Sequence, residues 1–174
     1  GLVKGASKGE GLGNKFLANI RETDAIIHVL RCFENDNITH VDGTIDPVRD
    51  KEIIDTELQL KDLETVENRI GKVSKQAATG DKTAKRLFDI LSRYKAALEQ
   101  GKSARTVELD KEDRKAVHDL HLLTDKPVLY VCNVDEKSAA KKLPKNTAVL
   151  GAKTACKNRA KLRVSVAMAN ISML

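Results

Sequence analysis

Asn133, Val134 and Glu136 follow directly after an apolar run, Val128 to Cys132, and their types suit the recognition of a nucleotide base. The amide of Asn133 can donate and accept hydrogen bonds, and the carboxylate of Glu136 can accept them. A continuous apolar run is typical of a buried parallel strand, and ligands of doubly wound α/β folds bind at the carboxyl ends of such strands. The spacing N-x-x-E also arises by chance, so a plain loop with an Asx turn is the alternative.

A second stretch that could do chemistry is the glycine-rich segment at the start of the sequence. A loop of this composition can bend sharply and direct backbone N–H groups at an anion. It precedes a helix-like run, Asn14 to Glu22, and the apolar run Ala25 to Cys32, which predicts a strand. Because a domain rarely opens on such a loop, we expect the chain to be a piece of a longer protein. The glycines are Gly5, Gly9, Gly11 and Gly13.

Between these two strands the pattern is helical. Apolar residues step by three and four along residues 51–78, Gly80 ends the pattern, and Asp81 can cap a second helix with the same stepping. Two such helices joined by a short turn predict an antiparallel coiled-coil hairpin. A third helix is expected over Lys111 to Leu123 and a last strand over Leu162 to Ala167. The predicted domains are residues 1–50, 51–109 and 110–174.

Basic residues are concentrated in two blocks. Residues 71–105 hold nine Lys and Arg against three acidic residues, and residues 137–174 hold nine against none, in a chain of net charge +6. A basic block is a common footprint for a phosphate backbone, although a solvated helix face is the alternative. On the predicted hairpin the candidates for RNA or ribosome binding are Lys72, Lys75, Lys82, Lys85, Arg86 and Arg93.

The composition excludes several classes of protein. Aromatic residues make up 3% of the chain and there is no Trp, which argues against a stacking platform for single-stranded nucleic acid. No apolar run approaches the ~20 residues of a membrane span. The cysteines, Cys32, Cys132 and Cys156, are odd in number and far apart, which is typical of reduced thiols in a cytoplasmic protein.

The most specific signal is a resemblance to a known family. Residues 1–33, GLVKGASKGEGLGNKFLANIRETDAIIHVLRCF, resemble the switch II loop, helix and following strand of the Obg-like ATPases, the YchF subfamily of P-loop GTPases. The similarity continues through residues 34–40, the helical stretch at residues 55–67, and residues 133–136, where typical GTPases have N-K-x-D. It covers roughly residues 1–136. It implies an α/β fold, a partial P-loop NTPase with a doubly wound parallel sheet and a coiled-coil insertion.

The resemblance also implies roles for single residues. Gly1 resembles the glycine of the D-x-x-G motif, whose N–H faces the γ-phosphate, and Leu2 falls where many GTPases keep a water-orienting glutamine. Because a leucine cannot orient water, His40, which resembles the family's catalytic histidine, is the candidate catalytic residue. The base-recognition residues would be Asn133, Val134 and Glu136, with ATP preferred over GTP.

The sequence also departs from the family. The motif G-x-x-x-x-G-K-[ST] is absent, and residues 137–161 do not follow the family. The intact protein is therefore expected to be a cytoplasmic, ribosome-associated nucleoside triphosphate hydrolase that uses ATP or GTP with Mg²⁺, whose metal ligands lie outside this chain. This chain alone is expected to be inactive. The alternatives are a basic helical hairpin that binds structured RNA or the ribosome without hydrolysis, and a purely structural coiled-coil fragment.

Overall fold

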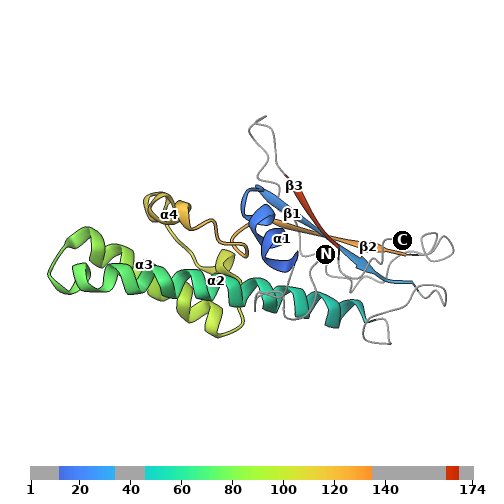
Figure 1. The fold of residues 1–174 in the computed structure, drawn as a ribbon, viewed down its shortest axis with the longest axis horizontal. Helices are drawn as coiled ribbons and strands as arrows, with labels where there is room; N and C mark the ends of the chain where they lie inside the picture. Colours follow the sequence, from blue (N-terminus) through green and yellow to red (C-terminus); the bar gives the residue numbers. More distant parts are fainter. Residues whose placement is uncertain (1–11, 34–45, 135–163, 169–174) are drawn as a thin grey trace. The chain divides into compact units, whose positions relative to one another are not determined.

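The computed structural model describes residues 12–33, 46–134 and 164–168 of the chain (Figure 1). The chain divides into two compact units, residues 1–54 with 127–174 and residues 55–126. The second unit thus takes in residues 110–126, which the sequence analysis assigned to the last domain. The reason is packing, because Val117, Leu120 and Leu122 are buried in the core of the helical unit.

The first unit contains a parallel sheet. Its described elements are α1 (Leu12–Arg21), β1 (Ala25–Arg31), β2 (Val128–Asn133) and β3 (Val164–Met168). The strand order is β2-β1-β3, and both neighbours run parallel to β1. This confirms the α/β class and the parallel sheet predicted from the apolar runs. Figure 1 shows the three strands side by side.

The neighbouring strands β1 and β2 differ in burial. Along β1 every second side chain is buried, at Ile26, His28 and Leu30, as expected for a strand with one covered face. The prediction that β2 is buried is wrong, because Leu129 and Val131 are 43% and 39% exposed. The reason is its position, since β2 lies at the edge of the described sheet and pairs only with β1.

Helix α2 (Pro47–Ala78) begins earlier than the sequence analysis predicted. The carboxylate of Asp46 accepts hydrogen bonds from the backbone N–H groups of Val48, at 3.1 Å, and Arg49, at 3.0 Å. Pro47 occupies the first helical position, where its fixed φ and missing N–H do no harm. This Asp-Pro pair is a helix-start signal, and it lies before residue 51, where the helical pattern was expected to begin.

The turn between the two long helices agrees with the sequence. Gly80 has φ +90°, a left-handed conformation that glycine adopts without strain. Asp81 then caps α3 (Lys82–Glu99) by accepting hydrogen bonds from the N–H groups of Thr83, at 2.8 Å, and Ala84, at 3.1 Å. The predicted helix end and the predicted cap are both confirmed.

The helical unit has one hydrophobic core. The buried residues of α2 and α3 are joined there by residues from η2 (Ala104–Thr106), α4 (Lys111–Val117) and η3 (His118–Leu120). The structure therefore differs from a hairpin that stands alone, because residues 104–122, which we call the returning segment, supply part of this core. The coiled-coil packing of α2 and α3 stays a prediction. The core consists of Val66, Val73, Ile90, Leu91, Tyr94, Leu98, Ala104, Val107, Val117, Leu120 and Leu122.

The third helix is shorter than predicted. Its start is as expected, because the Asp110 carboxylate accepts a hydrogen bond from the Asp113 N–H at 2.7 Å. The regular helix ends at Val117, however, and His121 adopts a left-handed conformation with φ +47°. The helical pattern of residues 111–123 thus gives way to a tertiary contact that fixes the residues after His121. None of the helices in the described ranges is long and apolar enough to cross a lipid bilayer.

The tertiary contact that fixes the residues after His121 is made by the carboxylate of Asp62, on α2, which is fully buried. Its Oδ1 accepts a hydrogen bond from the Leu123 N–H at 2.7 Å. Its Oδ2 accepts from the N–H and from the hydroxyl of Thr124, both at 2.7 Å. The Thr124 hydroxyl oxygen in turn accepts from the Ala104 N–H at 2.9 Å, so one carboxylate organises two turns of the chain.

We expect Asp62→Ala to lower the free energy of unfolding by about 2–5 kcal/mol, because each buried polar group left without its partner costs about 1–3 kcal/mol. Urea denaturation followed by circular dichroism measures the change. The control is Glu64→Ala on the same helix, whose exposed carboxylate pairs with Lys61 and which should change stability little. Equal losses in the two variants would contradict the assigned role of Asp62.

Candidate functional site

The candidate site lies where β1 and β2 end. Arg31 and Asn133 are in register across the two strands. The Cys32 N–H donates to the backbone carbonyl of Asn133 at 2.8 Å, so the backbone of Asn133 is held in the sheet. The side chain of Asn133 is exposed. The strand thus presents the exposed amide side chain of Asn133, able to donate and accept, at the edge where ligands of parallel sheets bind.

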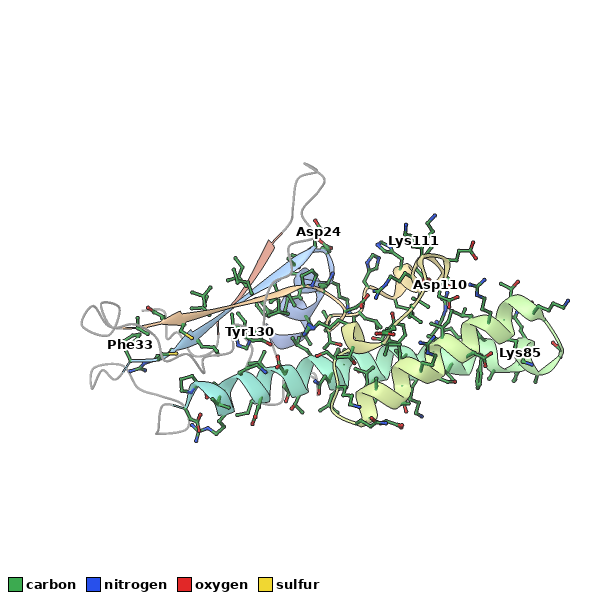
Figure 2. All side chains as sticks on the ribbon, turned by 180° about the vertical axis from the view of Figure 1, so that it is seen from behind. Asp24, Phe33, Lys85, Asp110, Lys111 and Tyr130 are labelled. Carbon is green, nitrogen blue, oxygen red and sulfur yellow. The ribbon has the colours of Figure 1, made fainter. Side chains whose placement is uncertain are left out.

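Arg31 was not singled out by the sequence analysis, although it is a charged residue at the end of an apolar run. It is only 5% exposed. Its Nε donates to the carbonyl of Phe33 at 3.0 Å, and its guanidinium carbon lies 5.0 Å from the centre of the Phe33 ring, a cation–π contact. Figure 2 shows Phe33 at the end of β1. Arg31 therefore fixes the path of the chain as it leaves the strand beside Asn133.

The other predicted nucleotide-site residues are only partly placed. Val134 directly follows β2 and is half-buried. Gly1, His40 and Glu136 lie outside the described residues. Within the described residues, no group of three or more His, Cys, Asp or Glu side chains is placed to hold a metal ion. The structure thus brings Asn133 and Val134 to one edge, together with Arg31.

A second cluster lies on the other face of the same strands. The ring of His28, which is buried, lies 5.4 Å from the ring of Tyr130, centre to centre. The Lys51 ammonium, from the first turns of α2, lies 5.2 Å from the centre of the Tyr130 ring. Figure 2 shows Tyr130 on β2. These contacts join the strands to the start of α2, which is a structural role.

The basic residues of the helical unit fall into two groups. Lys72, Lys75, Lys82 and Lys85 are exposed and lie on either side of the turn between α2 and α3. Figure 2 shows Lys85 near that turn, with Asp110 and Lys111 at the start of α4. We call these four residues the lysine tip. They are available to a partner.

Arg86 and Arg93 differ from the lysine tip, although all six were predicted together. The Arg86 Nε donates to Asp113 at 2.6 Å, and its other nitrogens lie 3.4 Å from the carboxylates of Asp110 and Glu112. The hydrogen bond to Asp113 raises the pKa of Arg86 above its ordinary value. Arg93 donates to the backbone carbonyl of Glu108. Both arginines therefore hold the returning segment to α3.

The chain is 59% identical, over 140 residues, to the ribosome-binding ATPase YchF of Bacillus subtilis, a match that covers 80% of this chain and 38% of that protein. It is 54% identical over 136 residues to the ribosome-binding ATPase YchF of Escherichia coli O157:H7, with 78% and 38% covered. The chain belongs to the YchF family. The matched length agrees with the resemblance over residues 1–136, which is confirmed.

A solved structure extends the YchF assignment to the fold. The Schizosaccharomyces pombe YchF GTPase matches with a TM-score of 0.66 at 36% identity, covering 79% of this chain and 38% of that one. A scan against models of protein families finds none that matches. The chain spans about 38% of the length of the YchF relatives it matches, so it corresponds to a fragment of a family member.

Proposed function

We propose that this chain carries the base-recognition part of a YchF-family enzyme that hydrolyses ATP in preference to GTP and acts with the ribosome in the cytoplasm. The observation that supports the proposal most is the position of Asn133. The residue that begins the N-x-x-E motif is exposed at the carboxyl end of a parallel strand, in a chain that is 50–59% identical to proteins named as ribosome-binding ATPases.

The described residues fit a nucleotide base better than they fit its phosphates. Asn133 offers a donor and an acceptor to the edge of the base, and Val134 offers an apolar surface beside it. Glu136 would complete the motif. The described residues offer no cluster of ligands for Mg²⁺. The magnesium ion, which would neutralise charge on the phosphates, would be held by parts of the full-length enzyme outside the described residues.

Hydrolysis also requires residues that the sequence lacks. A P-loop would cradle the β- and γ-phosphates with backbone N–H groups and a lysine, and no such motif is present. The phosphates supply most of the electrostatic attraction in nucleotide binding. We therefore propose that the 174-residue chain binds ATP weakly and does not hydrolyse it, whereas a full-length member that contains this sequence does both.

His40 is the proposed catalytic residue. Because Leu2 cannot orient the attacking water, an imidazole that accepts a hydrogen bond from it would take that part. We expect His40→Ala in the full-length protein to lower the ATP turnover number by about 10²-fold or more, with little change in ATP affinity. Phosphate release and calorimetry measure the two quantities. The 174-residue chain, tested beside them, should show neither turnover nor tight binding.

Two results would contradict this proposal. Unchanged turnover in His40→Ala would make His40 a loop residue without a catalytic role. Micromolar binding of ATP by the 174-residue chain would show that the phosphates are held without a P-loop. His118→Ala is a matched control variant, because His118 is an exposed histidine of the helical unit and is assigned no role in hydrolysis.

A second candidate function has its own observation. The lysine tip consists of four exposed cations close together on the helical unit, with little aromatic surface in the sequence. Such a surface fits the phosphate backbone of structured RNA, which is read by shape and charge. We propose that the lysine tip contacts ribosomal RNA. If the chain acts only in this way, it is a binding module rather than part of an ATPase.

A further inference from the structure

Two cysteines meet where the candidate site begins. Cys32 directly follows β1, and Cys132 lies in β2 opposite Leu30. Because side chains alternate between the faces of a strand, Leu30 and Cys32 share one face with Cys132. The two cysteines therefore lie on the same face of neighbouring strands, offset by two positions.

The orientation of the Cys32 side chain reduces the effect of this offset. The Sγ of Cys32 lies 3.7 Å from the carbonyl oxygen of Leu30, so its side chain turns back toward the level of Cys132. The Cys132 side chain is near enough to the Cys32 thiol to contribute to the rise in its pKa. Neither is in a disulfide; Cys132 is exposed, and Cys32 is half-buried. Two neighbouring thiols, one of them open to solvent, can be joined as a disulfide when a small oxidant accepts their two electrons.

We propose that Cys32 and Cys132 form a redox-active dithiol that closes to a disulfide when the protein meets a low-molecular-weight disulfide such as oxidised glutathione. No residue of the proposed hydrolytic site takes part in this chemistry. It is a modification site at the edge of the sheet.

The exchange takes place in two steps. The thiolate of Cys132 attacks one sulfur of oxidised glutathione, forms a mixed disulfide and releases one glutathione. The sulfur of Cys32 then attacks the sulfur of Cys132, forms the Cys32–Cys132 bond and releases the second glutathione. The two protein thiols lose two electrons and two protons, which reduce one oxidised glutathione to two thiols.

The environments of the two thiols set the order of these steps. Burial, together with the neighbouring Cys132 thiol, raises the pKa of Cys32 to about 12. Little Cys32 thiolate is present near neutral pH, so Cys32 is a poor first nucleophile. The exposed Cys132 is therefore the entry point, and Cys32 is the residue that resolves the mixed disulfide.

Closure of the disulfide would tie the ends of β1 and β2 together one residue before Asn133. The expected consequence, which rests on the proposed function, is a change in how the full-length protein binds the adenine base. The formation of the disulfide does not depend on nucleotide binding. The two can therefore be tested separately.

The test uses the third cysteine, Cys156, as an internal competitor. The 174-residue chain is treated with oxidised glutathione in native buffer and in guanidinium chloride, then alkylated, digested and examined by mass spectrometry for linked peptides. In an unfolded chain, loop closure favours Cys132–Cys156, separated by 24 positions, over Cys32–Cys132, separated by 100, by about eightfold. In native buffer we expect this ratio to reverse, so that Cys32–Cys132 predominates.

The possible outcomes separate clearly. Predominance of Cys132–Cys156 under both conditions, or glutathione adducts on Cys132 without an internal bond, would overturn the proposal. In Cys156→Ser the native Cys32–Cys132 bond should form unchanged, whereas Cys32→Ser should leave Cys132 as a stable mixed disulfide with glutathione. ATP affinity of the full-length protein before and after oxidation is the separate measure of the effect on the base site. An unchanged affinity would overturn that effect and leave the dithiol standing.

Discussion

Charge reversal at the lysine tip should abolish the association of the full-length protein with ribosomes while leaving the helices intact. Lys72, Lys75, Lys82 and Lys85 are exposed beside the turn between α2 and α3. If each lysine contacts one phosphate, affinity should fall about 100-fold between 50 and 200 mM salt. The reason is that binding releases counterions from the RNA, and this release becomes less favourable as the salt concentration rises. Replacing all four by Glu removes the attraction and adds repulsion. Ribosome co-sedimentation at several salt concentrations measures the effect.

A matched control comes from the same unit. The double variant Lys82→Glu with Lys85→Glu can be compared with Lys111→Glu and Lys115→Glu on α4, because both change the net charge equally and all four lysines are exposed. Only the first pair should weaken binding. Arg86 is unsuitable for this test, because its three carboxylate partners would lose their cation and the helical unit would be disturbed. Binding that survives reversal of the lysine tip would leave the hairpin as a protein–protein spacer.

Substitution of the motif that begins at Asn133 should change the choice of base. In N-K-x-D proteins the aspartate accepts two hydrogen bonds from guanine. Glu136 is one methylene longer and displaces the carboxylate, and Val134 lacks the lysine stem that covers the base. We expect Glu136→Asp with Val134→Lys to move the preference of the full-length protein toward GTP by about 1–3 kcal/mol, or roughly 5- to 150-fold. Calorimetry with ATP and GTP measures both affinities.

The control for this change is Asn133→Ala, which removes a group that both bases can use. It should weaken ATP and GTP binding together and leave their ratio close to its original value. If the double variant still prefers ATP by the original factor, backbone contacts and Asn133 set the choice of base, and the difference between Glu and Asp is irrelevant.

The strands, the end of α2 and the cap of α3 could be predicted from the sequence because short stretches of residues determine them. The apolar runs that form β1 and β2 predict strands by length and composition. The end of α2 and the start of α3 follow from Gly80 and Asp81, whose conformation and side-chain hydrogen bonds act within three residues. The helix-start signal of Asp46 and Pro47 is equally local, and the start of α2 could have been predicted from it.

The features that were missed depend on residues distant in the sequence. The length of α4 is cut by the contact of Asp62 with Leu123 and Thr124, which no local pattern announces. From the sequence, Arg86 is expected to be a surface cation, because its pairing with the acids at the start of α4 depends on tertiary packing. The contact between Cys32 and Cys132 requires the register of β1 and β2, which the two runs alone leave open. The candidate base site was predictable in kind, through Asn133, but its neighbour Arg31 was not.

The bonds from Asp62 to residues 123 and 124 join two points of the chain that are about sixty positions apart. From Asp62 the chain continues along α2, runs through the lysine tip and the shorter helices, and returns to the same carboxylate. Because Asp62 binds residues 123 and 124, the two ends of this segment are held together. Changes in the length or charge of the lysine tip would leave these two ends in place. The tip can therefore adapt during evolution to a different partner while the strands keep their register.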